Sequence, residues 1–396
     1  MFSKNERTVI SSLATILAFR MLGLFIIIPV FSPYLQNLND ATPLLIGITV
    51  GVYGLTQAIF QLPFGILSDY IGRREVITLG LVLFLLGSVV AGMSTSIWGM
   101  LLGRALQGAG AISGTIMALL SDSTSEDNRT KAMAIIGVSI GAAFILAFML
   151  GPMLTAFLSV SKVFYLTAIL VVPILYILWY LVPEVSLAAG DKSKTLLPKI
   201  SLHKTQLRHL QLHCFGIFTL HGILMANFVA VPIILKQIGL NNFEQGTAYI
   251  KIFILAVVFM LPLLFWSEKK RQQTKVMTVA IALLLISEFI FWLFSSNFWG
   301  IMAALVIFFT GFNILEASLP SIISKLAPQQ NKGATMGVYS TAQFLGPMVG
   351  GVLAGVLFKY FGLTSIFILG LCWAAVWLAL AIYANTKMQK NDVIKL

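Results

Sequence analysis

Five ionisable residues stand inside long apolar stretches of this sequence: Arg20, Arg104, His221, Glu288 and Glu316. Within a membrane such residues are costly and are functional candidates by default. A carboxyl group or an imidazole can take up and release a proton as its surroundings change between water and apolar protein. An arginine cannot release a proton in that pH range, so it would act on the proton affinity of a neighbour. These residue types predict proton chemistry.

Glu316 is the candidate proton carrier, with His221 as a candidate relay and Arg20 as the charge that adjusts the affinity of Glu316 for protons. A packing histidine is an equally good interpretation of His221. For Glu288 a buried accessory pair is the simpler interpretation.

Six uncharged polar residues are candidates for lining a substrate cavity: Tyr53, Gln57, Gln61, Asn227, Asn313 and Gln343. The first three follow a four-residue spacing, which places them on one face of a helix. Asn313 lies about one turn from Glu316 and shares its face. For each of the six, a hydrogen bond between helices is an equally good interpretation.

The elements that hold these residues are predicted to be membrane helices. Of the 396 residues, 58% are hydrophobic and 10% are charged, whereas about 25% are charged in a typical soluble protein. This composition excludes a soluble fold. At about 20 residues per span, the apolar stretches predict twelve helices, at 9–31, 44–66, 76–94, 97–120, 132–158, 163–182, 213–235, 247–266, 276–295, 299–323, 333–358 and 363–384.

The distribution of basic residues predicts the orientation. Most of the 26 Lys and Arg residues fall in segments on one side of the membrane if the N-terminus is cytoplasmic, and cytoplasmic loops are enriched in these residues. Both termini are therefore expected in the cytoplasm. The same bias explains the net charge of +12 without a nucleic acid partner. Cys214 and Cys372 lie in separate spans, so neither a disulfide nor a paired-thiol metal site is expected.

The two halves of the sequence resemble each other at an offset near 200. Ile97-Trp98-Gly99-Met100 matches Phe298-Trp299-Gly300-Ile301, and the segment from Asn128 to Met133 matches that from Asn331 to Met336. Two fused repeats of six helices are predicted, at 1–185 and 213–396, joined by a cytoplasmic loop at 186–212. Parallel repeats with a site near the midplane are typical of transporters. A receptor or a scaffold is the alternative.

One loop carries a motif, Gly65-Ile66-Leu67-Ser68-Asp69-Tyr70-Ile71-Gly72-Arg73-Arg74. Topology alone would explain the two arginines but not the spacing of the other residues. At these positions the sequence resembles the major facilitator superfamily, although the family usually has a basic residue in place of Tyr70. A second stretch, Arg104-Ala105-Leu106-Gln107-Gly108-Ala109-Gly110-Ala111, is similar to the motif of the fourth helix in that family. This resemblance implies that Arg104 is the competing proton-linked candidate.

The first span narrows the resemblance to one branch of the superfamily. Leu22-Gly23, Pro29-Val30 and Pro33 look like the first-helix motif of the twelve-helix drug:proton antiporter branch, with the last proline displaced by one residue. Within that branch the chain looks closest to the YajR-type transporters, without their soluble C-terminal domain.

Glycine and proline mark the fifth and eleventh spans. Antiporters of the family carry a longer Gly-Pro pattern in the fifth helix, of which this chain keeps Gly151-Pro152; the fuller form, Gly346-Pro347 followed by Gly350-Gly351, is in the eleventh. Proline removes a helix hydrogen bond and glycine permits close approach, so both helices are expected to bend or pack tightly there. Two packing kinks with no part in the direction of transport are the alternative.

The resemblance implies a cytoplasmic gate made of Gly65, Leu67, Asp69, Gly72, Arg73 and Arg74, with Asp122 as a partner of Arg73. It also implies proton-coupled export of a small, amphipathic compound or drug by alternating access, in a bacterial inner membrane and by a monomer. A sugar, amino acid or anion carrier of the same fold is the alternative, and a membrane receptor is a third. No nucleotide-binding loop occurs, and neither enzymatic activity nor a cofactor is expected.

Overall fold

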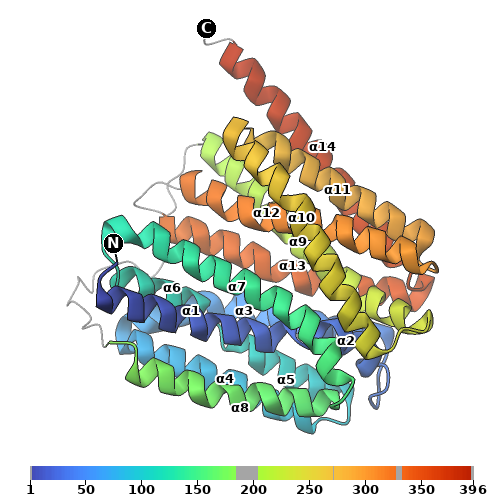
Figure 1. Cartoon of the computed structure of the whole chain (residues 1–396), viewed down its shortest axis with the longest axis horizontal. Helices are drawn as coiled ribbons and strands as arrows, with labels where there is room; N and C mark the ends of the chain where they lie inside the picture. Colours follow the sequence, from blue (N-terminus) through green and yellow to red (C-terminus); the bar gives the residue numbers. More distant parts are fainter. Residues whose placement is uncertain (1, 184–203, 271, 327–331, 394–396) are drawn as a thin grey trace. The chain divides into compact units, whose positions relative to one another are not determined.

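The computed structural model describes residues 2–183, 204–270, 272–326 and 332–393, and it is helical, as the sequence predicts (Figure 1). In this described part of the chain, eleven helical segments are long and apolar enough to cross a membrane. The fourth predicted span is made of two shorter helices and is not among these eleven. The predicted all-α membrane fold is confirmed.

The chain forms two compact units, one of Met1–Pro198 with Asn241–Gly246 and one of Lys199–Leu240 with Thr247–Leu396. The first contains α1 (Lys4–Phe25), α2 (Ile28–Leu35), α3 (Pro43–Ile71), α4 (Arg73–Met93), α5 (Ile97–Ala109), α6 (Ser113–Asp122), α7 (Glu126–Thr155) and α8 (Val160–Tyr180). The second contains α9 (Lys204–Gln237), most of α10 (Asn242–Lys270), α11 (Gln273–Phe294), α12 (Phe298–Leu326), α13 (Lys332–Phe361) and α14 (Ser365–Val393).

Several helices extend beyond the predicted spans. α9 begins at Lys204, inside the segment predicted as the central loop, and α14 continues to Val393. The reason is that hydropathy marks where a helix leaves the apolar layer, whereas the helix ends where its backbone hydrogen bonding ends. Most of the predicted loop at 186–212 lies outside the described residues.

The predicted single helix at 97–120 is wrong, because α5 ends at Ala109 and α6 begins at Ser113. A Cβ atom on Gly110 would overlap the backbone carbonyl of Gly80 on α4, so glycine permits a close helix contact at the break. Between the two helices, the backbone N–H groups of Ala111 and Ile112 each donate to the carbonyl two residues earlier, which turns the chain. The carbonyl of Gly110 accepts a bond from Arg20, which satisfies a group near the break.

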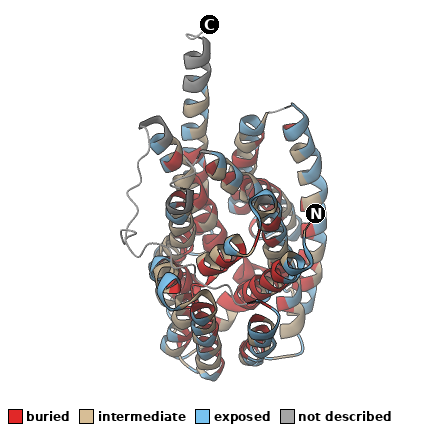
Figure 2. Cartoon of the chain, turned by 90° about the vertical axis from the view of Figure 1, so that its left-hand side faces the viewer, coloured by how far each residue is buried: buried red, intermediate tan, exposed pale blue. Residues whose placement is uncertain are grey.

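Corresponding helices pack alike in the two units. In the first, α1 packs against α7, and α4 against α5 and α8; in the second, α9 packs against α13, and α11 against α12 and α14. In Figure 1, α1 runs beside α7, and α4 runs beside α8. Buried residues follow the faces that helices turn towards one another, and exposed residues cover their outer faces (Figure 2).

Both predicted glycine and proline sites lie at close helix contacts. A Cβ atom on Gly151 of α7 would overlap the carbonyl of Ile26, and one on Gly350 of α13 would overlap the carbonyl of Gly222. Gly346 lies equally close to the backbone of α9 at Phe218. Pro152 and Pro347 lie within their continuous helices. The bending role predicted for these residues stays a prediction.

Candidate functional site

Three polar side chains from three helices of the second unit meet at Glu316. Gln343 Nε2 of α13 lies 3.1 Å from Glu316 Oε1 of α12 and 3.2 Å from His221 Nε2 of α9. His221 Nε2 lies 3.6 Å from Glu316 Oε2. We call these three residues the Glu316 cluster. The side chains of His221 and Glu316 are 13% and 37% exposed, so the cluster is partly open to its surroundings.

Hydrogen bonding assigns a role to each nitrogen of His221. Its Nδ1 lies 3.2 Å from the carbonyl of Ile217 on the same helix, an acceptor only, so Nδ1 carries hydrogen. In the neutral ring Nε2 is then an acceptor, and the Gln343 amide can donate one hydrogen to it and the other to Glu316. A proton on Nε2 would replace the bond from Gln343 by an ion pair with Glu316. The arrangement can therefore hold and pass on a proton.

Two further polar residues lie on helices that supply the cluster, Tyr339 on α13 and Asn313 on α12. Tyr339 precedes Gln343 by one turn of α13, is buried, and interacts electrostatically with Glu316. Its hydroxyl has no hydrogen-bond partner among the described residues, and neither has the amide nitrogen of Asn313. Sequence reasoning selected Asn313 but missed Tyr339, since an aromatic residue in an apolar helix is ordinary. The four-residue spacing from Gln343 was the signal that could have found it.

Arg20 is held entirely within the first unit. It donates to the carbonyl of Gly110 at 2.7 Å, to Gln57 Oε1 at 3.3 Å and to Ser113 Oγ at 3.3 Å. Gln57 is thus a partner of Arg20, and Ser113 is a polar contact that sequence reasoning missed. The predicted coupling of Arg20 to Glu316 stays a prediction, because the two residues belong to separate units.

Arg104 lies in a second polar network of the first unit. Its Nη1 donates to Gln107 Oε1 at 2.7 Å and lies 3.5 Å from the carbonyl of Leu24, while its guanidinium carbon lies 4.8 Å from the centre of the Tyr53 ring. The amide of Gln107 donates in turn to Ser88 Oγ at 2.8 Å. Tyr53 therefore supplies an aromatic face to a buried cation.

The gate motif forms a compact set of contacts at the end of α3. Arg73 Nη1 lies 2.6 Å from Asp69 Oδ1, and Arg73 Nε lies 3.2 Å from Asp122 Oδ2. Gly72 has a φ of 112°, a left-handed conformation that favours glycine. Arg74 donates to the carbonyl of Val182 and lies over the Trp179 ring.

The remaining candidates lie in separate surroundings. Gly65 has open space at its Cβ position, and Leu67 is half-buried. Gln61 lies beside Gly114 of α6, and its amide oxygen has no partner in the described part of the chain. Asn227 is buried and donates to Glu288 Oε1 at 2.6 Å. Its side chain is thus engaged within the second unit.

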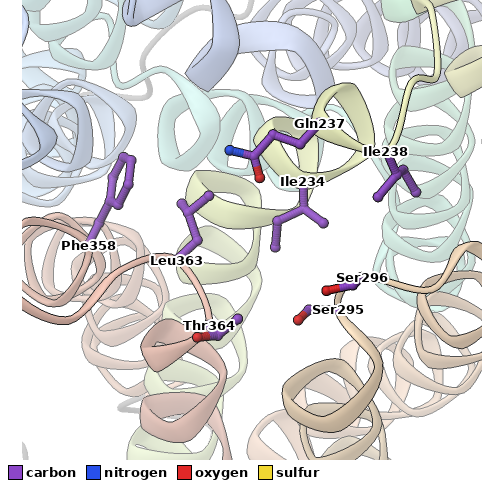
Figure 3. Close-up of a pocket in the computed structure, with 8 residues that line it drawn as sticks. All are labelled: Ile234, Gln237, Ile238, Ser295, Ser296, Phe358, Leu363 and Thr364. Carbon is purple, nitrogen blue, oxygen red and sulfur yellow. The ribbon is translucent and has the colours of Figure 1, made fainter.

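A cavity of about 410 Å³ lies near the C-terminal end of α9 (Figure 3). Its lining is Ile234, Gln237, Ile238, Ser295, Ser296, Phe358, Leu363 and Thr364. No lining residue is ionisable, and Ile234 is thirteen residues beyond His221 on α9, a distance of about 20 Å along the helix. The cavity is separate from the Glu316 cluster.

The chain resembles known membrane transporters over nearly its whole length. It is 43% identical over 379 residues to the inner membrane transport protein YajR of Escherichia coli strain K12, covering 95% of this chain and 83% of that protein. It is 24% identical over 409 residues to multidrug resistance protein 2 of Bacillus subtilis strain 168, covering 99% and 98% of the two chains. The first of these relatives is a transport protein, which agrees with the expectation from the sequence that the chain is not an enzyme.

A solved structure and a family model agree with the helical architecture. The structure is a bacterial homologue of the human lysosomal transporter Spinster, in an inward-facing and occupied conformation, with a TM-score of 0.74, 13% identity and 98% coverage of each chain. The model of the Major Facilitator Superfamily matches residues 13–212 and 213–393. The two matches follow each other along the chain and together leave only its ends uncovered, so this multi-pass membrane protein belongs to the Major Facilitator Superfamily.

Proposed function

We propose that the protein exports a small amphipathic compound from the cytoplasm of a bacterium in exchange for protons, working in the inner membrane by alternating access. The observation that carries the proposal is the Glu316 cluster, in which a carboxyl group and an imidazole share the Gln343 amide. No Lys or Arg among the described residues forms an ion pair with Glu316. Its charge is thus free to change with protonation.

The cluster supports coupling through a change in the exposure of Glu316. A carboxyl group favours its neutral form when it is removed from water and its charged form when water reaches it. In the proposed cycle, Glu316 accepts a proton when the site faces outwards and releases it when the site faces the cytoplasm. His221 passes the proton by way of its Nε2 atom, which lies 3.6 Å from Glu316 Oε2.

Proton entry supplies enough free energy for export. One charge that crosses a potential of 100 mV releases about 2.3 kcal/mol, and a factor of ten in concentration corresponds to about 1.4 kcal/mol. One proton per cycle would thus sustain a gradient of more than tenfold. The relationship to a multidrug resistance protein supports an amphipathic substrate.

The test begins with purified protein in liposomes and a panel of radiolabelled drugs, sugars and amino acids under an imposed pH gradient. For any compound that is accumulated, Glu316→Gln should abolish pH-driven accumulation while retaining exchange of the compound, because the amide keeps the size and polarity of the side chain but cannot cycle a proton. Glu268→Gln, at an exposed carboxylate of α10, is the matched control. If the Glu316→Gln protein accumulated the compound with the same dependence on pH as the wild type, the proposal would be contradicted.

A second candidate is the carriage of an anionic compound. Arg20 and Arg104 are fully buried and make no ion pair with a carboxylate among the described residues. The Nε atom of each arginine and Nη2 of Arg104 also have no partner in that part of the chain. Organic anions in the same panel discriminate the two candidates, since saturable uptake of anions alone would favour the second.

A further inference from the structure

The second unit contains another carboxyl group outside the Glu316 cluster. This group is fully buried, whereas Glu316 is partly exposed. Glu288 of α11 is 0% exposed. Its neighbours include Asn227 of α9 and Gly370 of α14. A Cβ atom on Gly370 would overlap Glu288 Oε2, so the glycine leaves room for the carboxyl group.

Glu288 has no counter-charge among the described residues. No Lys, Arg or His side chain there lies within ion-pair distance of it. The helices that pack against α11 are α12 and α14, and α9 reaches Glu288 through Asn227. None of the three brings a charged or titratable side chain into an ion pair with Glu288 in the described residues. The neighbouring hydroxyl of Ser287 donates to the carbonyl of Leu284 on its own helix. An ionised Glu288 would thus be a buried, unpaired charge, which is strongly unfavourable.

The pair of Glu288 and Asn227 lacks a hydrogen-bond donor. Asn227 Nδ2 donates to Glu288 Oε1 at 2.6 Å. Glu288 Oε2 and Asn227 Oδ1 are both buried and both lack a partner among the described residues. An ionised carboxylate and an amide oxygen are acceptors only, whereas a protonated carboxyl group carries one O–H donor. A single proton on Glu288 therefore supplies a donor to a pair in which Asn227 Oδ1 is an acceptor without a partner among the described residues.

We propose that Glu288 is a proton-binding site, in which a neutral carboxylic acid pairs with the Asn227 amide and joins α11 to α9. A proton needs no cavity, which fits a site that is fully buried. Asn227 lies six residues beyond His221 on α9, so the pair braces the helix that carries His221. This assignment stands apart from proton carriage by Glu316, because it rests on other atoms and predicts a bound proton rather than a cycling one.

The bound proton makes the stability of the protein depend on pH. A glutamate in an unfolded chain loses its proton at about pH 4.3, so at neutral pH the folded protein holds one proton more than the unfolded chain. The contribution of Glu288 to stability is then highest at low pH and falls as pH rises, by a factor of up to ten in the folding equilibrium per pH unit. The fall continues over the range in which the folded protein keeps its proton.

Infrared difference spectra of the purified full-length chain in detergent test the assignment directly. At about pH 7, the wild type minus Glu288→Gln should show the C=O band of a protonated carboxyl group. Glu268→Gln should show only the bands of a carboxylate. Asn227→Leu should move the protonated-carboxyl band to higher frequency, because the acid loses its hydrogen-bond partner. Carboxylate bands in place of the acid band at Glu288 would overturn the proposal.

Unfolding in mixed micelles gives an independent measurement. Between about pH 6 and pH 8, the unfolding constant of the wild type should rise relative to that of Glu288→Gln by up to tenfold per pH unit. Equal dependence on pH in the two proteins would count against the bound proton. If Glu288→Gln does not fold, the band position in Asn227→Leu still decides, since an unshifted band or the absence of an acid band contradicts the pairing. Transport by Glu316→Gln tests the proposed function separately.

Discussion

At the scale of single residues, Arg104 shows how a buried cation is held without an ion pair in the described part of the chain. Its Nη1 donates to Gln107, and the guanidinium group lies over the rings of Tyr53 and Phe31. A contact between a cation and an aromatic ring contributes roughly 0.5 to 2 kcal/mol. The planar group is necessary because it stacks on the rings and donates at its edge at the same time.

Arg104→Lys should therefore destabilise the first unit although it keeps the charge. We expect a loss of about 1 to 3 kcal/mol, the usual range when a buried network is broken, because an ammonium group cannot both stack and donate in a planar fork. Thermal unfolding in detergent measures the loss, with Arg7→Lys at an exposed position of α1 as the control. Equal melting temperatures for the two variants would show that the fork geometry does not matter.

At the scale of helices, a close contact between a glycine and a backbone carbonyl occurs in both units. Gly151 brings α7 against the backbone of Ile26, directly after the end of α1, and Gly350 brings α13 against the backbone of α9. In both pairs the neighbour is a carbonyl oxygen, which cannot move aside as the end of a flexible side chain can. Close helix packing through small residues is a principal source of association between helices in membranes.

Gly350→Ala should separate α13 from α9 and destabilise the second unit. Overpacking of this kind typically costs about 1 to 3 kcal/mol. Gly337→Ala on the same helix is the matched control, because a Cβ atom there has no neighbour within 4 Å and alanine favours the helix by about 1 kcal/mol. Opposite shifts in melting temperature are expected, and a stabilised Gly350→Ala protein would contradict the close contact.

The helix pair α9 and α13 also positions the Glu316 cluster. His221 lies one residue before Gly222, and Gln343 lies one turn before Pro347. Spacing along the sequence placed each residue on its helix but could not predict that the Gln343 amide would lie between His221 and Glu316. That contact depends on the separation and rotation of three helices.

At the scale of the whole molecule, the family match and the apolar helices agree with a chain that crosses the membrane repeatedly. The Lys and Arg residues of the loops predict that both termini lie in the cytoplasm. A green fluorescent protein joined to Leu396 should therefore fluoresce. Alkaline phosphatase joined at the same place should be inactive, because the phosphatase forms its disulfides only on the oxidising side of the membrane. Phosphatase inserted after Asn39, between α2 and α3, should be active. The reverse pattern of reporter activity would show that the termini lie on the opposite side of the membrane.

The sequence by itself determined the fold class, the approximate spans and the family. Apolar length and the Gly65 to Arg74 motif are local signals, and a membrane requires every span to satisfy its own backbone hydrogen bonds. Boundaries were less accurate, as the start of α9 at Lys204 shows. The break between α5 and α6 was missed because it depends on the contact of Gly110 with the backbone of Gly80.

Only the tertiary structure decided which polar side chains meet. Asn227 was a candidate for the cavity, and for Glu288 a buried accessory pair with no named partner was the simpler interpretation. The structure places Asn227 Nδ2 2.6 Å from Glu288 Oε1. They are sixty-one residues apart in the sequence, so no periodicity relates them. Arg20 and Gln57 meet in the same way across α1 and α3. The reason is physical: hydropathy and spacing act along one helix, whereas a hydrogen bond between helices depends on how their faces are turned towards each other.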